Sequence, residues 1–342
     1  MAPKAHTTTP VASSGSSATT VALTATFDRS AKRSKTPPVA GSTTLGRQRI
    51  ITGDCRQVLK TLPDGSGALL LSDPPYEYKL HGCRWNCTGV ATDPEVWAQS
   101  YRVAKPGAYA LIFAGPQTSH RMICAIEDAG FMIRGKIVWA RSNGMPKGRR
   151  LTGEVSSYHT ALKPLHEEII VAQKPPGMTF QKCMETHGVG ARNIEASRIP
   201  LAPGEDLTVV GDGGKLDTRG DGWGFRRMSR SGDLGRWPGD VILSGPAADA
   251  LEEQEPGASR FFYVARPERG EKDAGLDGAR NPHNTVKPIA LLRHLIRLHA
   301  GHADGEVIDM FAGSGSTGCA AALEGRPFTG IELDADYADA AY

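Results

Sequence analysis

Apolar residues along the chain fall into short continuous runs and into segments with helical spacing. The continuous runs predict buried strands, which we place at 48–51, 67–72, 108–113, 131–138, 166–172, 261–264, 306–310 and 326–333. The segments with helical character lie between them, at 58–62, 94–103, 119–129, 285–298 and 319–324. Strands that alternate with helices in this way predict an α/β fold with a doubly wound, mostly parallel sheet.

Proline and glycine residues separate these elements. Lys105-Pro106-Gly107 is expected to stop the second helix before the strand at 108–113 begins. The first helix joins two strands, of which one is followed by Asp54 and the other by Asp73. We expect these two strands to be neighbours, with both carboxylates at the carboxyl edge of the sheet. Open α/β sheets bind their ligands at that edge.

Two long stretches lack this periodicity. Residues 1–46 are rich in Ser, Thr, Ala and Pro, which predicts a disordered tail. Their composition is also superficially that of a transit peptide, but no amphipathic pattern supports that interpretation. Periodicity fades again within 177–260, where Gly, Arg and Trp accumulate. We therefore divide the chain into a tail (1–46), a first half (47–176), an insertion (177–260) and a second half (261–342).

The net charge of +3 over 342 residues is too small to indicate a polyanionic partner, so any nucleic-acid surface must be local. One basic loop, 141–150, is either a solvated turn or a phosphate contact made by Lys147 and Arg149. A second stretch, 221–237, interleaves basic residues with aromatics, which suits a flexible insertion or a nucleic-acid surface. Its candidate phosphate contacts are Arg226, Arg227 and Arg230.

The six cysteines do not have the spacing of a disulfide framework. His81, Cys83 and Cys87 are close in the sequence, but no fourth ligand is evident, so we expect reduced thiols and no metal. No apolar stretch is long enough to cross a membrane, and no signal peptide is visible. These features predict a cytoplasmic protein that does not act at a membrane.

The first candidate site is Asp73-Pro74-Pro75-Tyr76, directly after the buried strand at 67–72. The two prolines stop the strand, because neither can donate to a sheet ladder and each fixes its own φ. A carboxylate, a stiff backbone and an aromatic ring are left at the carboxyl end of the strand. The four residues by themselves are equally consistent with a proline turn that Asp73 caps.

The second candidate site is the glycine-rich loop 311–318, between a strand and a helix of small residues. Its glycines let a ligand approach the backbone, and the helix after it offers free N–H groups. Glu332, at the end of the next strand, can accept hydrogen bonds from ribose hydroxyls. The loop has neither Gly-x-Gly-x-x-Gly spacing nor a Lys-Ser/Thr pair, which disfavours a dinucleotide and excludes a P-loop. A smaller nucleoside such as S-adenosylmethionine fits this layout better.

Together these motifs resemble the S-adenosylmethionine-dependent amino-group DNA methyltransferases, in the permuted motif order called the β class. The resemblance covers residues 50–336 and rests on motifs that follow the family's order: Gly53-Asp54-Cys55, Asp73-Pro74-Pro75-Tyr76, Asn284-Thr285-Val286-Lys287-Pro288, Phe311-x-Gly313-x-Gly315-x-Thr317 and Gly330-Ile331-Glu332. Shorter echoes are Leu162-Lys163-Pro164, His166-Glu167, Gly235-Arg236-Trp237-Pro238 and Arg260-Phe261-Phe262-Tyr263. Met310 departs from the family, which more often has proline at that position.

The resemblance implies a Rossmann-like, circularly permuted methyltransferase fold. Its catalytic half is 47–176, its target-recognition insertion 177–260 and its cofactor-binding half 261–342. It also implies that the flipped base enters at Asp73, Pro74, Pro75 and Tyr76. The implied cofactor pocket has Asp309, Phe311, Gly313, Gly315 and Thr317 around methionine and adenosine, Glu332 at the ribose, Asp54 and Cys55 at the adenine, and Thr285, Lys287 and Pro288 as its closure.

An exocyclic amino group is a poor nucleophile, because its lone pair is delocalised into the ring. Two fixed acceptors, the Asp73 carboxylate and the Pro74 carbonyl, can draw the lone pair back onto nitrogen. Tyr76 can stack on the base once it has left the helix. In the family, Asp before Pro-Pro-Tyr is typical of adenine enzymes and Ser of cytosine enzymes. The sequence therefore predicts N6-adenine methylation of double-stranded DNA, with N4-cytosine methylation as the alternative.

Two functions of other classes stay open. A methyltransferase for RNA or protein glutamine can use a similar site, but it usually has the cofactor loop ahead of the catalytic motif. A non-catalytic DNA-binding protein on this fold is disfavoured by the intact motifs. A separately encoded restriction enzyme, as the other half of a restriction-modification pair, and a homodimer stay open as partners.

Overall fold

The computed structural model of the chain describes residues 42–45, 47–78, 88–144, 148–202, 205, 235–276, 278–283, 285–302 and 305–341. Within these ranges, no helix combines the length and the apolar character needed to cross a membrane.

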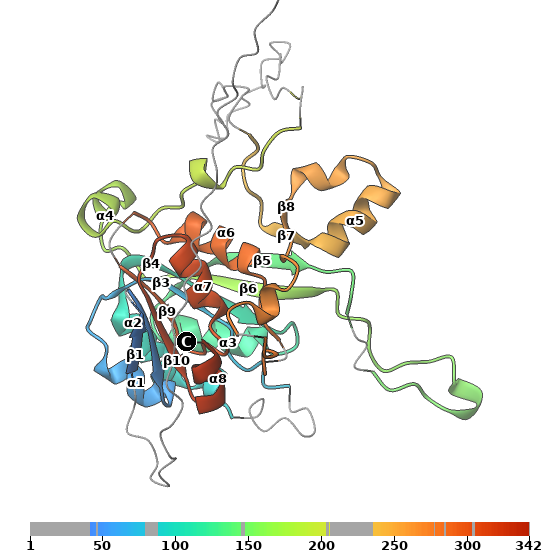
Figure 1. The fold of residues 1–342 in the computed structure, drawn as a ribbon, viewed down its shortest axis with the longest axis horizontal. Helices are drawn as coiled ribbons and strands as arrows, with labels where there is room; N and C mark the ends of the chain where they lie inside the picture. The colour runs from blue at the N-terminus through green and yellow to red at the C-terminus, as the bar shows by residue number, and fades with distance from the viewer. Residues whose placement is uncertain are drawn as a thin grey trace, which may run out of the picture. The chain divides into compact units, whose positions relative to one another are not determined.

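Ten strands of the described chain form one sheet, in the order β1-β2-β10-β9-β3-β4-β6-β5-β7-β8 (Figure 1). They are β1 (Ser42–Leu45), β2 (Gln48–Thr52), β3 (Gly67–Ser72), β4 (Ala104–Ala114), β5 (Met132–Ala140), β6 (His166–Gln173), β7 (Val241–Ser244), β8 (Tyr263–Ala265), β9 (Glu306–Asp309) and β10 (Phe328–Glu332). The strands from β2 to β4 are parallel, as are β5, β7 and β8. Only β1 and β6 pair antiparallel with their neighbours. The prediction of a mostly parallel α/β sheet is confirmed.

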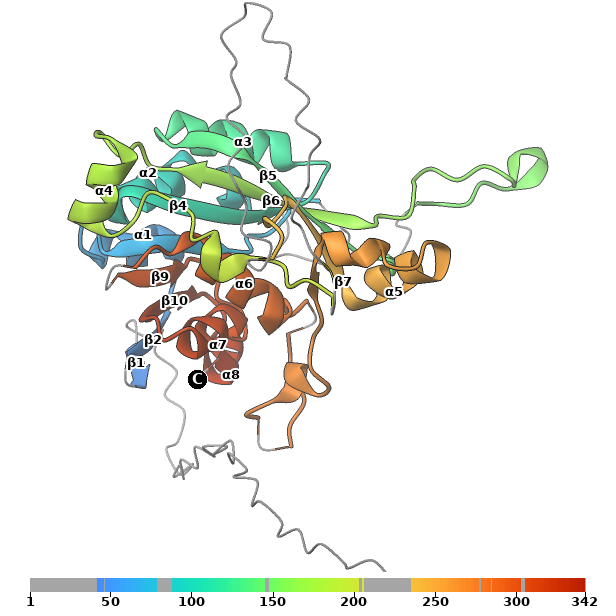
Figure 2. The same ribbon diagram turned by 90° about the horizontal axis from the view of Figure 1, so that it is seen from above.

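Helices cover both faces of the sheet (Figure 2). They are α1 (Cys55–Thr61), α2 (Pro94–Val103), α3 (Ser119–Asp128), α4 (Phe180–His187), α5 (Gly245–Gln254), α6 (Ile289–His299), α7 (Ser316–Leu323) and α8 (Ala335–Ala341). Helices α1, α2 and α3 pack on one face of the sheet, and α6, α7 and α8 pack on the other. Each face has its own apolar cluster. This doubly wound arrangement was expected from the alternating pattern, and it leaves the strand ends as the accessible edges.

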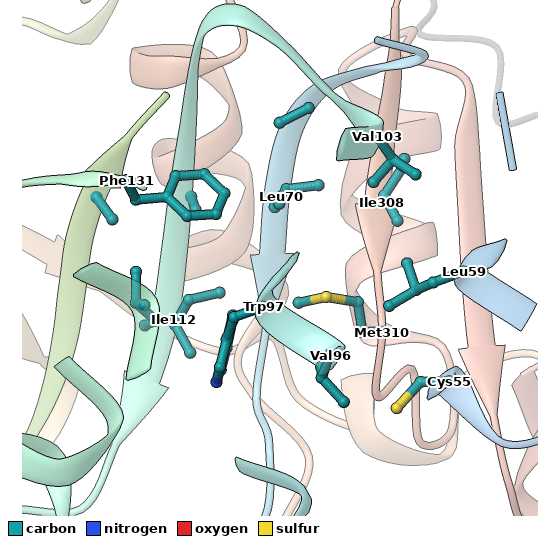
Figure 3. Close-up of a cluster of buried hydrophobic side chains, with 14 of the residues drawn as sticks. Cys55, Leu59, Leu70, Val96, Trp97, Val103, Ile112, Phe131, Ile308 and Met310 are labelled. Carbon is teal, nitrogen blue, oxygen red and sulfur yellow. The ribbon is translucent and has the colours of Figure 1, made fainter. Parts of the chain in front are cut away.

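The apolar cluster under α1, α2 and α3 holds β3 and β9 in place (Figure 3). Trp97 is fully buried there with Leu70 of β3 and Met310, which follows β9. Its indole N–H donates to the carbonyl of Ala91 at 3.0 Å, so the large ring is satisfied as well as buried. Asp93 caps α2 by accepting a backbone N–H, which fixes the start of that helix. The carboxyl ends of β3 and β9 therefore emerge from a rigid core.

Three sequence-based expectations are wrong. The strands before Asp54 and Asp73 are not neighbours, because β10 and β9 lie between β2 and β3. Lys105-Pro106-Gly107 does not separate helix from strand, since β4 begins at Ala104 and contains it. Gly107 adopts a φ of 84°, which only glycine takes readily, and the register with β3 shifts at this point. The strand predicted at 261–264 is present, but its predicted start is wrong, since β8 begins at Tyr263 after a 3₁₀ turn at Ala258–Phe261.

Two segments that lack clear periodicity contribute to the sheet. Residues 42–45, placed in the tail by composition, form β1 and pair with β2. Within 177–260, the structure has α4, β7 and α5, and β7 extends the sheet by pairing with β5. Both strands have only four residues, too few for a periodic pattern to be recognised. The assignment of 177–260 as a target-recognition insertion stays a prediction.

Candidate active site

Four carboxylates follow one another along the carboxyl edge of the sheet. Asp54 comes after β2, Glu332 ends β10, Asp309 ends β9 and Asp73 comes after β3. Because the sheet order is β2-β10-β9-β3, residues far apart in the sequence lie in a row. The row crosses three strand spacings, about 14 Å. That length suits a nucleoside with an extended side chain better than a single ion.

The ends of β3 and β9 are joined by a buried hydrogen-bond network. The hydroxyl of Ser72 donates to Asp309 Oδ1 at 2.5 Å and accepts the N–H of Met310 at 2.9 Å. The N–H of Phe311 also donates to Asp309 Oδ1, at 3.0 Å. Burial raises the pKa of Asp309 to about 6, although hydrogen bonds from Ser72, Thr317 and Phe311 oppose that rise. Asp309 thus fixes the start of the glycine-rich loop.

The glycine-rich loop needs its glycines for conformation and for space. Gly313 has a φ of 52° and Gly315 a φ of 85°, both in the left-handed region. A Cβ on Gly313 would lie 3.2 Å from the ring of His283. The N–H of Gly313 donates to Glu332 Oε2 at 2.7 Å, and the N–H of Asp334 donates to Oε1 at 2.8 Å. Glu332 therefore holds the loop, and burial raises the pKa of its carboxyl.

A cleft opens beside this loop, with about 410 Å³ of free space including its mouth. Seven of the predicted site residues line it: Asp73, Thr285, Lys287, Asp309, Phe311, Gly313 and Thr317. Ser72, Phe113 and His283 also line the cleft, and the sequence did not single them out as site residues. Ser72 is the last residue of β3 and Phe113 lies near the end of β4, so only the fold shows that they face the cleft.

Five predicted cofactor residues do not line the cleft: Asp54, Cys55, Pro288, Gly315 and Glu332. Cys55 is buried in the core, and burial raises the pKa of its thiol to about 12. Asp54 caps α1 and pairs with Arg56 at 2.5 Å. It nevertheless lies beside Glu332, because the N–H of Gly53 donates to the Glu332 carbonyl at 2.8 Å. Contact of Asp54 and Cys55 with an adenine ring stays a prediction.

Asp73 forms the floor of the cleft at the end of β3. Its Oδ2 accepts a hydrogen bond from Lys287 Nζ, whereas its Oδ1 is buried and has no hydrogen-bond partner in the described part of the chain. Burial raises the pKa of Asp73, against the nearby Lys287 cation. The backbone after Asp73 is held as well, since the hydroxyl of Thr118 donates to the Tyr76 carbonyl at 2.6 Å. Glu77 follows with a φ of 55°, a strained conformation for a residue other than glycine.

Lys287 lies between two carboxylates. Its Nζ is 3.3 Å from Glu167 Oε2 as well as paired with Asp73, and it lies 4.8 Å from the ring centre of Phe113. The Tyr76 hydroxyl donates to the same Glu167 oxygen at 3.1 Å. Burial lowers the pKa of Lys287, but Asp73 and Glu167 outweigh it, so the net shift is upward. Lys287 was expected only to close the cofactor pocket, and the fold places its charge beside the Asp73 carboxylate.

Glu167 was not predicted as a site residue. It lies near the start of β6, which runs antiparallel to β4 and so brings its first residues to the carboxyl edge of β3 and β4. Arg141 Nη1 lies 2.9 Å from its Oε1. Burial raises the pKa of Glu167, but Lys287 and Arg141 lower it by more. The echo at His166-Glu167 was the signal in the sequence, although it did not show what the carboxylate contacts.

Of the predicted DNA contacts, only Arg149 lies within the described residues. Lys147, Arg226, Arg227 and Arg230 lie outside the described residues, as do His81, Cys83 and Cys87. Arg149 is exposed on the excursion 148–165, which extends between β5 and β6 (Figure 1). The side chains of Tyr158 and Leu162 on this excursion are 66% and 92% exposed. Exposed apolar and basic side chains together are typical of a contact surface.

Comparisons with known proteins relate this chain to DNA methyltransferases. The family model N6_N4_Mtase, described as DNA methylase, matches residues 68–342. Type II methyltransferase M.HindIII of Haemophilus influenzae is 30% identical over 115 residues, which cover 29% of this chain and 37% of that protein. Type II methyltransferase M.BglII of Bacillus subtilis is 23% identical over 306 residues, covering 86% of this chain and 68% of that protein. Among solved structures, the PvuII DNA methyltransferase (cytosine-N4-specific) aligns with 86% of this chain and 84% of its own, at 14% identity and a TM-score of 0.49.

Proposed function

The chain belongs to the N6_N4_Mtase family of DNA methylases, and we propose that it methylates the N6 amino group of adenine in duplex DNA. S-adenosylmethionine is the proposed methyl donor. The observation that carries the proposal is that Asp73 lines the cleft and that its Oδ1 is buried with no hydrogen-bond partner among the described residues. A buried polar atom without a partner costs free energy, so its presence beside a cleft supports a site that a ligand completes.

Features of the cleft fit S-adenosylmethionine. The left-handed glycines of the loop let a nucleoside approach the backbone, and the row of carboxylates suits a ligand with hydroxyl and amino groups. Glu332 can accept ribose hydroxyls, because each carboxylate oxygen has lone pairs beyond those used by Gly313 and Asp334. Thr285 and Thr317 add hydroxyl groups to the lining. When bound, the cofactor supplies the electrophilic methyl carbon of its sulfonium group.

The residues of the chain prepare the amino group. Asp73 Oδ1 accepts one N–H of the base and the Pro74 carbonyl accepts the other, which localises the lone pair on nitrogen. Pro74 and Pro75 keep these acceptors in place, so little reorganisation accompanies the reaction. Tyr76 is oriented by its hydrogen bond to Glu167 and by an edge-on contact with Tyr78, with ring centres 5.7 Å apart. A ring held in this way can stack on a flipped base.

Adenine is favoured over cytosine by the first residue of the motif. Asp73 stands where the resemblance places Asp in adenine enzymes and Ser in cytosine enzymes. N4-cytosine methylation is the second candidate, because the family includes both reactions and both acceptors serve either amino group. Nucleoside mass spectrometry of duplex DNA treated with the protein and S-adenosylmethionine tests the choice. Methyladenine supports the proposal, and methylcytosine without methyladenine overturns it.

Substrate class is tested in the same preparation. Transfer of a labelled methyl group is measured on duplex DNA, structured RNA and a protein mixture in parallel. DNA-only labelling is expected, whereas labelling of RNA or protein alone assigns the chain to one of the other substrate classes. Absence of label in all three, with intact DNA binding, would identify a non-catalytic DNA-binding protein.

The two relatives named above are Type II methyltransferases, which suggests the partners that this chain would have. We propose that it protects DNA against a separately encoded restriction enzyme of the same specificity. Modification-sensitive sequencing of DNA with and without the protein identifies the methylated sequence. Sedimentation equilibrium decides between a monomer and the proposed homodimer.

A further inference from the structure

In the described part of the chain, Asp73 belongs to a connected group of ion pairs whose four charges cancel. Asp73 and Glu167 supply two negative charges, and Lys287 and Arg141 supply two positive charges. Lys287 is shared by the two carboxylates, whereas Arg141 contacts only Glu167 among the pairs recorded in the described residues. The side chains of Lys287 and Glu167 are 10% and 13% exposed, so solvent screens these contacts weakly.

The two carboxylate oxygens of Asp73 have different environments. Lys287 holds Oδ2, and among the described residues Oδ1 is buried and has no hydrogen-bond partner. Lys287 is itself held by three further contacts, with Glu167, with the Tyr76 hydroxyl at 3.4 Å and with the face of Phe113. A lysine in an ordinary surface ion pair is free to move, whereas Lys287 is held from several sides.

We propose that Lys287 and Glu167 are positioning residues for Asp73: Lys287 holds Oδ2 and favours the ionised carboxylate, and Glu167 fixes Lys287, so that Oδ1 is left for the amino group of the base. In this arrangement Lys287 favours the carboxylate form of Asp73, and Glu167 limits how strongly it does so. Arg141 orients Glu167 from the opposite side. The inference rests on the proposed function, since it specifies how the acceptor of that reaction is prepared.

The two residues have opposite electrostatic effects on Asp73, and this makes the proposal testable. Lys287 lowers the pKa of Asp73 and Glu167 raises it. Tyr76, Asp309 and His283 also lie within electrostatic reach of Asp73, and these groups are unchanged in the variants below. A purely structural role would not produce shifts of opposite sign.

The experiment measures kcat against pH on unmethylated phage DNA, at saturating S-adenosylmethionine, for the full chain and its variants. Lys287→Met keeps the apolar stem and removes the charge, so kcat near neutral pH should fall by about 100-fold or more. The acid limb of the pH profile, where kcat falls as Asp73 becomes protonated, should move to higher pH. The activity of this variant should therefore recover partly as the pH rises. Glu167→Gln should move the acid limb to lower pH. Glu167→Asp, which restores the charge, should return the limb toward that of the original protein.

The matched control is Glu168→Gln, which removes a carboxylate from the next residue of β6. Glu168 pairs with Lys136 at 2.8 Å and has no recorded contact with Asp73 or Lys287. Its pH profile should be unchanged. Circular dichroism and cofactor calorimetry on each variant separate misfolding and weak cofactor binding from a changed acid limb.

The outcomes separate the inference from the proposed function. If the original protein transfers no methyl group to DNA, the proposed function fails. If it does, but Lys287→Met and Glu167→Gln shift the acid limb in the same direction or not at all, the inference is wrong. Opposite shifts with an unchanged Glu168→Gln profile support it.

Discussion

Replacing Asp73 with asparagine tests the central residue of the site with the smallest change of shape. The amide keeps an oxygen near the position of the carboxylate but removes the negative charge and adds two donors. Lys287 loses one anionic partner and keeps the other, because Glu167 remains 3.3 Å away. The substitution therefore separates the charge of the acceptor from its geometry.

The expected loss of activity follows from what the charge does. A hydrogen bond to a charged group contributes about 1.5–3 kcal/mol, against about 0.5–1.5 kcal/mol for a neutral one. Loss of one preorganised electrostatic group typically lowers kcat by about 10²–10³. We expect Asp73→Asn to fall in that range, with cofactor affinity changed by less than about threefold, since Glu332 and the loop are untouched.

The thermal stability of Asp73→Asn, unlike its activity, should be unchanged or higher. Burial raises the pKa of Asp73, so the folded protein binds that proton more tightly than the unfolded chain does. Such a group stabilises the fold below its unfolded pKa, and the contribution is lost as the pH rises through the folded pKa. Wherever the pH is high enough to ionise the folded carboxyl, its charge is therefore a cost that asparagine removes. The melting temperature of Asp73→Asn should equal or exceed that of the original protein.

The assay is single-turnover transfer of labelled methyl to duplex DNA, with thermal unfolding and calorimetry on the same samples. Glu168→Gln, which removes one carboxylate of the same sheet edge, is the control and should retain full activity. Transfer by Asp73→Asn at a rate near that of the original protein would refute the role of Asp73 as the charged acceptor. A large drop in melting temperature would instead refute the electrostatic account of the site.

Three further predictions concern Glu332, Asp309 and the excursion 148–165. Glu332→Ala should weaken S-adenosylmethionine binding by about 10- to 150-fold, measured by calorimetry, because it removes a charged acceptor and the anchor of Gly313; equal affinity would place Glu332 outside the pocket. Asp309→Asn should become more stable than the original protein as the pH rises from 4 to 7, by about 3 kcal/mol, because the pKa of Asp309 is raised to about 6; a constant difference across this range would contradict the buried charge. Arg149→Ala with Arg150→Ala should flatten the dependence of log affinity on log salt by roughly one per lost phosphate contact, and an unchanged slope would make the excursion 148–165 a solvated loop.

The local pattern of the sequence was enough to predict most elements of the sheet. Long apolar runs such as 67–72 and 108–113 are fully buried strands, because a strand covered on both faces leaves no polar position. Helix α2 occupies the predicted range 94–103, since its proline and its Asp93 cap define the start locally. The motifs at 73–76 and 311–317 could be recognised in the same way, because each consists of residues that are close in the chain, and members of both line one cleft.

The tertiary structure alone decided which side chains meet. No local signal shows that β9 and β10 lie between β2 and β3, since strand order depends on contacts between distant segments. The same holds for Ser72 with Asp309, which are 237 residues apart, and for Lys287 with Asp73 and Glu167. Sequence motifs placed Lys287 near a cofactor because they record which residues are present. The electrostatics of Asp73 depend instead on distances of a few ångströms between strand ends, and only the folded sheet sets those distances.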